Sequence, residues 1–129
     1  MIKVLDTTFL VDLIRGKEET RALWGKKDDL LTTQMNMYEV IRGFFMKGMP
    51  PEKFVRAMEL FENIRVLPLN DPSIIKAAEI SARLKKEGNT VADADCLAAG
   101  IALAHGITTI VTRNTEHFKR MKGLIVESY

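Results

Sequence analysis

Acidic and amide side chains recur where the sequence predicts the ends of buried strands. Asp6 directly ends the apolar run of residues 2–5, and Asn114 closely follows the β-branched run TTIVT. Glu39 and Asp95 stand in NMYEV and VADADCLAAG, two segments that open predicted helices. A charge at the end of a buried strand costs free energy unless a partner satisfies it. Such residues therefore either cap helices or hold something positive.

Brought together, these oxygen-bearing side chains would favour one kind of chemistry. Two carboxylates about 4 Å apart, at an effective dielectric near 20, repel each other by roughly 4 kcal/mol. A carboxylate cluster must therefore take up protons or bind cations. Donor sets made only of oxygen favour hard ions such as Mg²⁺ or Mn²⁺. The usual chemistry of that arrangement is phosphoryl transfer, in which the metal activates a water and stabilises the leaving oxygen.

Each acid also has a structural explanation when it is taken alone. Asp6 could cap the helix that starts at Thr7, and Asn36 and Glu39 have the spacing of a capping box. Asp93 and Asp95 open a predicted helix, where the helix dipole favours acids. Only the placement of all the acids on one edge of a sheet would favour a functional site.

The elements that must position these residues alternate between strand and helix. Predicted strands cover residues 2–5, 30–33, 64–69, 108–112 and 124–127. Predicted helices cover residues 7–15, 36–48, 51–61, 71–88 and 93–105, with a turn or short helix up to Phe118. This alternation favours an α/β fold with a mainly parallel sheet covered on both faces. In open parallel sheets ligands bind beyond the carboxyl ends of the strands, which is where the acids are expected to meet.

Composition narrows the class of protein. The 129 residues carry a net charge of +2, contain one cysteine and show no repeat or linker, so a single domain over residues 1–129 is expected. Cys96 alone cannot form an intramolecular disulfide, which favours a reducing compartment. No stretch approaches the roughly 20 apolar residues that span a bilayer. We therefore expect a soluble cytoplasmic protein without a membrane partner, and the mild basic charge alone does not argue for nucleic acid.

Three segments resemble a known family in their order and spacing: LDTTFLVDLIRG, MNMYEVIRG and VADADCLAAGIALAHGITTIVTRNTEHF. They are similar to the motifs of PIN-domain ribonucleases, especially the VapC-type toxins of prokaryotic toxin–antitoxin pairs. The resemblance covers nearly the whole chain. It implies a three-layer α/β/α sandwich, Mg²⁺- or Mn²⁺-dependent endoribonuclease activity, and structured RNA, often transfer RNA, as the substrate. It also implies a cognate antitoxin protein as partner and a homodimer.

Carried over by motif position, the metal-binding carboxylates would be Asp6 of LDT, Glu39 of YEV and Asp95 of DCLAA. The fourth catalytic position, usually Asp in TRD, is Asn114 here. A neutral amide lowers the charge of the site by one, and Glu116 could supply the missing carboxylate. Asp93 is a further candidate ligand, but residues i and i+2 of a helix point about 200° apart. The motif selects Asp95, and Asp93 would then cap the helix.

Hydroxyl and basic residues would complete the site implied by the resemblance. Thr7, Thr8 and Thr112 are expected to hydrogen-bond the ligating carboxylates. Basic residues on loops or helix ends could hold RNA phosphates, with solvated surface charge as the alternative; they are Arg15, Arg42 and Arg113, followed by Lys47 and Arg120. In the family, the region of residues 36–63 helps to form the groove for the antitoxin. Its apolar side chains could equally be core.

Two other functions compete with an RNA-cleaving toxin. Because of Asn114, the chain could be a catalytically weakened PIN scaffold that binds RNA or protein without cleavage. A signalling receiver domain would also place acids on the edge of an α/β sheet. That fold needs an acidic pair after the first strand and a Lys after a late one, whereas LDTT offers one acid and TTIVT is followed by Arg113. The sequence therefore disfavours a receiver.

Overall fold

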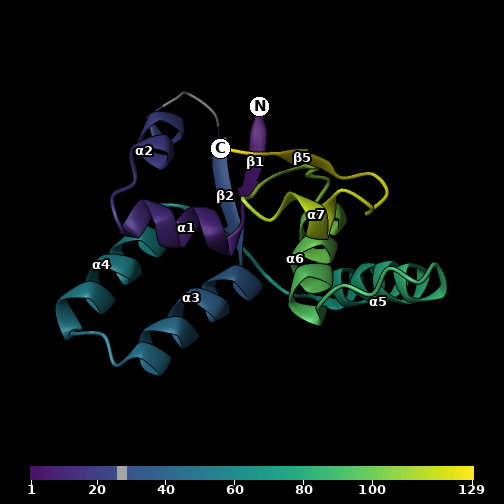
Figure 1. Ribbon diagram of the computed structural model, residues 1–129, viewed down its shortest axis with the longest axis horizontal. Coiled ribbons are helices and arrows are strands. Elements are labelled where there is room, and N and C mark those ends of the chain that lie inside the picture. Colours follow the sequence, from purple (N-terminus) through teal and green to yellow (C-terminus); the bar gives the residue numbers. More distant parts are fainter. Residues whose placement is uncertain (26–28) are drawn as a thin grey trace.

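A single parallel sheet organises the molecule (Figure 1). The computed structural model describes residues 1–25 and 29–129, and the strands lie in the order β3-β2-β1-β4-β5. The strands are β1 (Ile2–Leu5), β2 (Asp29–Thr33), β3 (Arg65–Leu67), β4 (Thr109–Val111) and β5 (Ile125–Glu127). All four pairings are parallel, which confirms the predicted type of sheet.

Helices cover both faces of this sheet. Figure 1 shows four of them on one side, namely α1 (Thr7–Ile14), α2 (Glu18–Trp24), α3 (Gln34–Lys47) and α4 (Pro51–Glu62). The opposite side carries α5 (Asp71–Lys86), α6 (Asp93–Ala104) and the short α7 (Thr115–Phe118). The predicted three-layer α/β/α sandwich is therefore confirmed. No helix of the described residues is long and apolar enough to cross a membrane.

Alternation along the central strands divides the core in two. Val4 and its register partner Ile110 pack with the core of α5 and α6. The next pair, Leu5 and Val111, packs with the core of α1, α3 and α4. Successive side chains of a strand point to opposite faces, so an apolar run buried on both sides is what a central parallel strand requires.

Helix α2 is the element that the sequence pattern did not predict. It is one of the shorter helices and opens with Glu18 and Glu19, and it buries only Thr20 and Leu23. So few apolar positions give no clear 3.6-residue period. Acids in the first turn favour a helix through the helix dipole, so Glu18 and Glu19 were the sequence signal that could have predicted α2.

The structure corrects three predicted helix caps. Thr33, and not Asn36, caps α3, and its Oγ1 accepts a hydrogen bond from the Asn36 backbone N–H. Ala92, and not Asp93, takes the N-cap position of α6. Asp6 does take the expected N-cap position of α1, but its side chain makes no capping hydrogen bond. The Asp6 carboxylate is therefore available for other contacts.

Helices α5 and α6 approach each other closely at a glycine. A Cβ atom added at Gly100 would lie 2.7 Å from the Ala77 Cβ and 2.8 Å from the Ser73 carbonyl oxygen. Real Cβ contacts are longer than this, so the small residues of α6 allow a backbone contact that a side chain would prevent. This contact fixes α6, the helix that carries Asp95.

Candidate carboxylate site

The predicted acids meet at the carboxyl edge of the sheet. Asp6 follows β1 and continues its ladder, because its backbone N–H donates to the Val111 carbonyl at 3.0 Å. Thr112 follows β4, the neighbouring strand, and α3 starts directly after β2 on the other side. Glu39 lies in the second turn of α3, and Asp95 lies in the first turn of α6. Three neighbouring strands thus position the site.

Both oxygens of the Asp6 carboxylate are held by neutral donors. Thr112 Oγ1 donates to Oδ2 at 2.7 Å, Thr8 Oγ1 donates to the same oxygen at 3.4 Å, and Asn36 Nδ2 donates to Oδ1 at 3.1 Å. The side chain is buried. Burial raises the pKa of Asp6, the Thr112 hydrogen bond opposes this rise, and the charge of Asp95 adds to it. The carboxylate is therefore fixed in place, and it forms no ion pair with a basic side chain of residues 1–25 and 29–129.

Glu39 faces the same region from α3. Thr7 Oγ1 donates to its Oε1 at 2.8 Å, and Arg42 Nη2 lies 3.9 Å from its Oε2. Burial raises the pKa of Glu39, and the charges of Asp6 and Asp95 raise it further. Glu39 and Asp6 are therefore coupled through their charges and through neighbouring threonines.

Asp95 is partnered by a histidine. Its Oδ2 lies 2.8 Å from the Nδ1 of His117 in α7. The structure thus places an imidazole ring directly on one carboxylate of the site.

The cluster of Asp6, Glu39 and Asp95, called the carboxylate site below, suits a hard cation by its chemistry. The three acids influence one another electrostatically, and their donors are all oxygens. As arranged here, however, no three His, Cys, Asp or Glu side chains within residues 1–25 and 29–129 lie close enough together to hold a metal ion. Ion binding would require these side chains to draw closer, for example by release of Asp95 from His117.

The other predicted ligands lie farther from this arrangement. Asn114 is exposed, and its backbone N–H donates to Thr112 Oγ1 at 2.9 Å, so it starts α7 beside the site. Glu116 is exposed and pairs with Lys119 at 2.7 Å, which lowers its pKa. Asp93 lines a hollow between α5 and α6 together with Cys96 and Leu97. The structure thus separates Asp93 from Asp95, as the helical spacing predicted.

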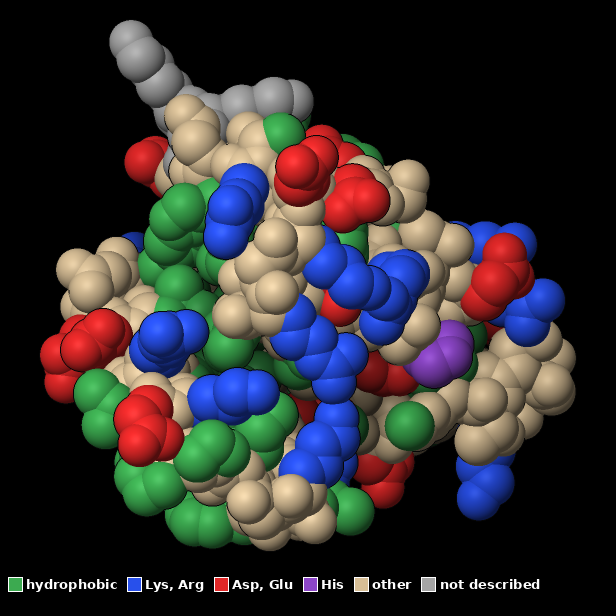
Figure 2. Space-filling view, turned by 60° about the vertical axis from the view of Figure 1, so that its left-hand side comes forward, with side chains coloured by type: hydrophobic (Ala, Val, Ile, Leu, Met, Phe, Trp, Pro, Cys, Tyr) green, Lys and Arg blue, Asp and Glu red, His purple; other side chains and the backbone are tan. Residues whose placement is uncertain are grey.

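Basic side chains gather on the face beside the carboxylate site. Figure 2 shows a band of Lys and Arg side chains across this view, with acidic groups visible next to it. Arg42 lies against Glu39 and over the Tyr38 ring, 5.3 Å from its centroid. Arg113 follows Thr112 directly and bonds through its backbone N–H to Thr8 Oγ1 at 3.0 Å. Arg120 lies elsewhere and donates to Asn89 at 2.7 Å.

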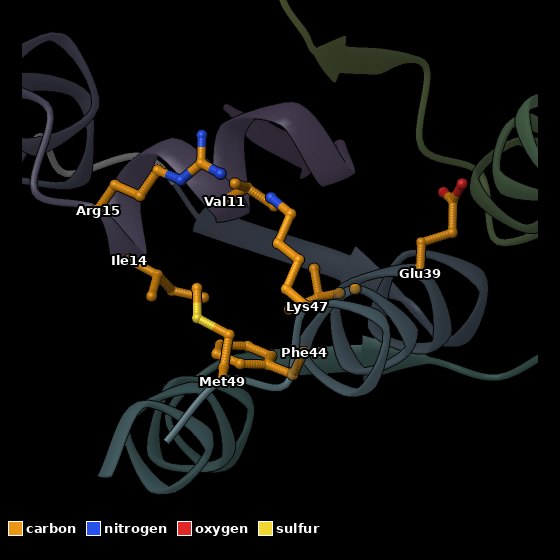
Figure 3. Close-up of a pocket in the computed structure, with 9 residues that line it drawn as sticks. Val11, Ile14, Arg15, Glu39, Phe44, Lys47 and Met49 are labelled. Atoms are coloured by element: carbon orange, nitrogen blue, oxygen red, sulfur yellow. The ribbon is translucent and has the colours of Figure 1, made fainter. Parts of the chain in front are cut away.

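A mainly apolar pocket lies between α1 and α3 (Figure 3). Val11, Ile14 and Arg15 line it from α1. The α3 side and the turn after it contribute the remaining residues, which are Glu39, Val40, Gly43, Phe44, Lys47 and Met49. Glu39 belongs both to this pocket and to the carboxylate site, so a ligand that fills the pocket would lie beside one of the three acids.

Two features of the site went unrecognised in the sequence. Asn36 connects the start of α3 with the junction of β1 and α1, because its Nδ2 donates to Asp6 Oδ1 at 3.1 Å and to Thr7 Oγ1 at 3.0 Å. Asp12 is fully buried on α1 and bonded to Tyr129. A signal for Asp12 was present, since an acid within the apolar helix pattern FLVDLI indicates a buried polar contact.

Comparison with known proteins was made by sequence and by structure. The family model described as PIN domain matches residues 3–124. The tRNA(fMet)-specific endonuclease VapC of Shigella flexneri is 30% identical over 132 residues, covering 98% of this chain and 96% of that protein. Ribonuclease VapC1 of Rickettsia felis is 26% identical over 127 residues, covering 95% and 92%.

Solved structures of similar fold come from toxin–antitoxin complexes. DNA-bound VapBC from Salmonella typhimurium superposes with a TM-score of 0.86 at 23% identity, covering 99% of this chain and 98% of that chain. FitAcB from Neisseria gonorrhoeae gives a TM-score of 0.78 at 25% identity, covering 98% and 96%.

Proposed function

Because the chain belongs to the PIN domain family, and its curated relatives include VapC ribonucleases, we propose that it is a divalent-metal-dependent endoribonuclease toxin of a toxin–antitoxin pair. The observation that carries the metal-dependent activity is the convergence of Asp6, Glu39 and Asp95 on one edge of the sheet, where burial and mutual repulsion raise the pKa of Asp6 and Glu39. A polyanionic RNA strand cannot approach such a cluster unless cations neutralise it.

Asp6, Glu39 and Asp95 would hold Mg²⁺ or Mn²⁺, with Asn114 as an additional neutral oxygen ligand. A bound ion of this kind activates a water and stabilises the leaving oxygen of a phosphodiester. Neighbouring side chains position the carboxylates that would hold the ion. Thr112 and Asn36 fix the two oxygens of Asp6, and Thr7 fixes one oxygen of Glu39. Such outer hydrogen bonds keep carboxylate ligands oriented.

For the substrate we propose structured RNA, with transfer RNA first. The support is that two relatives, 28% and 30% identical over nearly the whole chain, are tRNA(fMet)-specific endonucleases. Arg15, Arg42 and Arg113 would contact phosphates, which position a strand without reading its sequence. The choice of RNA therefore depends on other contacts.

For the partner we propose an antitoxin that docks in the pocket between α1 and α3. Similar solved structures are complexes of this type, and the pocket combines apolar walls with Arg15 and Lys47 at its rim. The homodimer and the cytoplasmic location expected from the sequence stay predictions.

The test is RNA cleavage by the purified chain. We expect cleavage of transfer RNA in Mg²⁺ or Mn²⁺, loss of cleavage in EDTA, and a fall of at least about 100-fold in Asp95→Asn, the scale expected when a key electrostatic group of an active site is lost. Lys76→Gln is the matched control, because it removes a charge on α5 that pairs with Glu79 and not with an acid of the carboxylate site. Undiminished cleavage in both Asp6→Asn and Asp95→Asn would contradict the carboxylate mechanism.

The neutral Asn114 favours a second candidate, a PIN scaffold that binds RNA or protein without cleavage. The same assay distinguishes the two functions. The scaffold predicts RNA binding without cleavage in any divalent metal, and cleavage once Asn114→Asp restores the fourth carboxylate.

A further inference from the structure

Asp12, a buried carboxylate on α1 outside the carboxylate site, forms ion pairs with two basic side chains. Asp12 is 1% exposed, with Lys17 Nζ 3.4 Å from its Oδ1 and Arg113 Nη1 3.2 Å from its Oδ2. Tyr129 Oη donates to Oδ2 at 2.6 Å, while its ring packs edge-on against Phe9 with centroids 5.0 Å apart. Asp12 thus ties together the turn after α1, the segment after β4 and the segment after β5.

The partners of Asp12 more than offset the effect of burial on its pKa. Burial alone would raise the pKa of Asp12, but the hydrogen bond from Tyr129 and the charges of Lys17 and Arg113 lower it overall. Burial and the bond to Asp12 raise the pKa of Tyr129 to about 12, so its hydroxyl stays protonated and continues to donate. Asp12 is therefore a permanent anion near neutral pH.

Both basic side chains keep an accessible surface. The Lys17 side chain is 46% exposed and the Arg113 side chain is 54% exposed. A guanidinium carries five N–H donors, and the ion pair with Asp12 engages Nη1. Donors of Arg113 therefore remain for an anion that approaches from solvent.

The backbone fixes these side chains relative to the carboxylate site. The Arg113 N–H donates to Thr8 Oγ1 at 3.0 Å, and the Lys17 N–H donates to the Asp12 carbonyl at 3.0 Å. Thr8 also bonds to Asp6, and Thr8 and Asp12 lie one turn apart on α1. At 1.5 Å per residue, Asp12 lies about 9 Å along the helix from Asp6. That separation is too long for contact with the reacting phosphate and suits a neighbouring phosphate.

We propose that Lys17 and Arg113, held by Asp12, form a second phosphate-binding point for the RNA strand, with Asp12 and Tyr129 as positioning residues. The proposal rests on the ribonuclease function proposed above. The group that Lys17 and Arg113 would bind together is a backbone phosphate of single-stranded RNA.

The effect of removing Asp12 distinguishes positioning from general electrostatics. Asp12→Asn takes away a negative charge, so the field of the whole protein alone predicts tighter binding of RNA. A positioning role predicts weaker binding, because the two basic side chains lose the anion that holds them. The two explanations therefore predict opposite signs.

The experiment measures the Kd of a mixed-sequence single-stranded RNA oligonucleotide by fluorescence anisotropy over a series of KCl concentrations. The full-length chain carries Asp95→Asn so that the oligonucleotide is not consumed. We expect Lys17→Gln and Arg113→Gln each to reduce the slope of log affinity against log salt by about 0.7, with a rise in Kd of about fivefold. Asp12→Asn should also raise the Kd, and its effect should not add to that of Arg113→Gln. Lys76→Gln should change neither quantity.

An unchanged or lower Kd in folded Asp12→Asn overturns the proposal. If Asp12→Asn fails to fold, Tyr129→Phe decides, because it removes one donor to Asp12 and keeps the ring on Phe9. Weaker binding by Tyr129→Phe then supports the proposal, and an unchanged Kd overturns it. Wild-type RNA cleavage is measured separately, so a failure of the proposed ribonuclease function is distinguishable from a failure of this phosphate-binding point.

Discussion

Glu39 and Asp6 lie where burial and neighbouring negative charges disfavour the ionised form of a carboxyl group. Both are largely removed from water, each repels the other, and Asp95 repels both. Their hydrogen-bond donors are uncharged threonines and an asparagine, and the charge of Arg42, 3.9 Å from Glu39, offsets the repulsion only in part. The folded protein therefore carries electrostatic strain at neutral pH that a bound cation or a bound proton would relieve.

Replacing Glu39 by Gln should stabilise the fold at neutral pH. Gln keeps the volume and can still accept the hydrogen bond from Thr7, while the repulsion from Asp6 and Asp95 disappears. Relief of an active-site charge of this kind gives about 0.5–2 kcal/mol in the free energy of unfolding. We expect a higher Tm at pH 7, measured by circular dichroism, together with loss of RNA cleavage.

The sign of the pH dependence provides the control. Because the folded-state pKa of Glu39 is raised, the wild type gains stability as the pH falls through that pKa toward about 4.3, the value of an unperturbed Glu. The advantage of Glu39→Gln should therefore shrink as the pH falls and vanish near pH 4. An advantage that is independent of pH would point to a cause other than charge.

Among single residues, the sequence predicted the positions of the acids and the hydrogen bonds of the three threonines better than the contacts of the residues around them. The acids follow strands or open helices, and those positions are visible in the sequence. The hydrogen bonds expected of Thr7, Thr8 and Thr112 are present. The contact between Asp12 and Tyr129 spans 117 positions of the chain, so the pattern around Asp12 indicates a buried polar contact but not its partner. Only strand order and side-chain direction in space reveal it.

At the scale of elements, α6 connects packing with the carboxylate site. Asp95 lies five residues before Gly100 on this helix, and Gly100 touches the α5 backbone. The small residues of DADCLAAGIALA are thus required by the close approach of two helices. The sequence predicted this helix almost to its ends but gave no reason for its glycine.

Gly100→Ala should therefore destabilise the protein. The added methyl would meet Ala77 at 2.7 Å, so one helix must shift, at a cost of about 1–3 kcal/mol in the free energy of unfolding. Urea unfolding measures this loss, and RNA cleavage should fall with it because Asp95 moves with α6.

Gly43→Ala is the matched control for Gly100→Ala. A Cβ at Gly43 in α3 meets nothing within 4 Å, and Ala favours a helix over Gly by about 0.5–1 kcal/mol. This variant should be as stable as the wild type or more stable. Equal effects of the two substitutions would show that the contact between α5 and α6 is not tight.

At the scale of the molecule, the alternating pattern of strand and helix predicted the layers of the sandwich correctly. The resemblance to the PIN domain, drawn from three motifs, is confirmed by the match over residues 3–124. The helix caps and α2 were not predicted correctly, because local polar residues allow several equivalent starts. That residues 1–129 form one domain, and that the named acids act together, stay predictions of the sequence.

The pocket between α1 and α3 allows a test of the whole toxin–antitoxin assembly. Gly43→Leu should place an apolar side chain in the pocket, since Gly43 lines it and the Cβ position is open. We expect the cognate antitoxin to bind at least about tenfold more weakly, as loss of one buried apolar contact of about 1.4 kcal/mol implies. Calorimetric titration measures the affinity, and Gly43→Ala should bind nearly as the wild type does. Equal antitoxin affinity in Gly43→Leu would place the interface elsewhere.

The order of the strands also governs when the activity can arise during synthesis. β1 pairs with β4, so Asp6 acquires its bond to Thr112 only after 106 further residues have been added. Pairings between such distant segments form late and slowly. A nascent chain on the ribosome, surrounded by RNA, therefore lacks an ordered carboxylate site until translation has passed β4. Topology alone delays the activity until β4 and Thr112 have been synthesised.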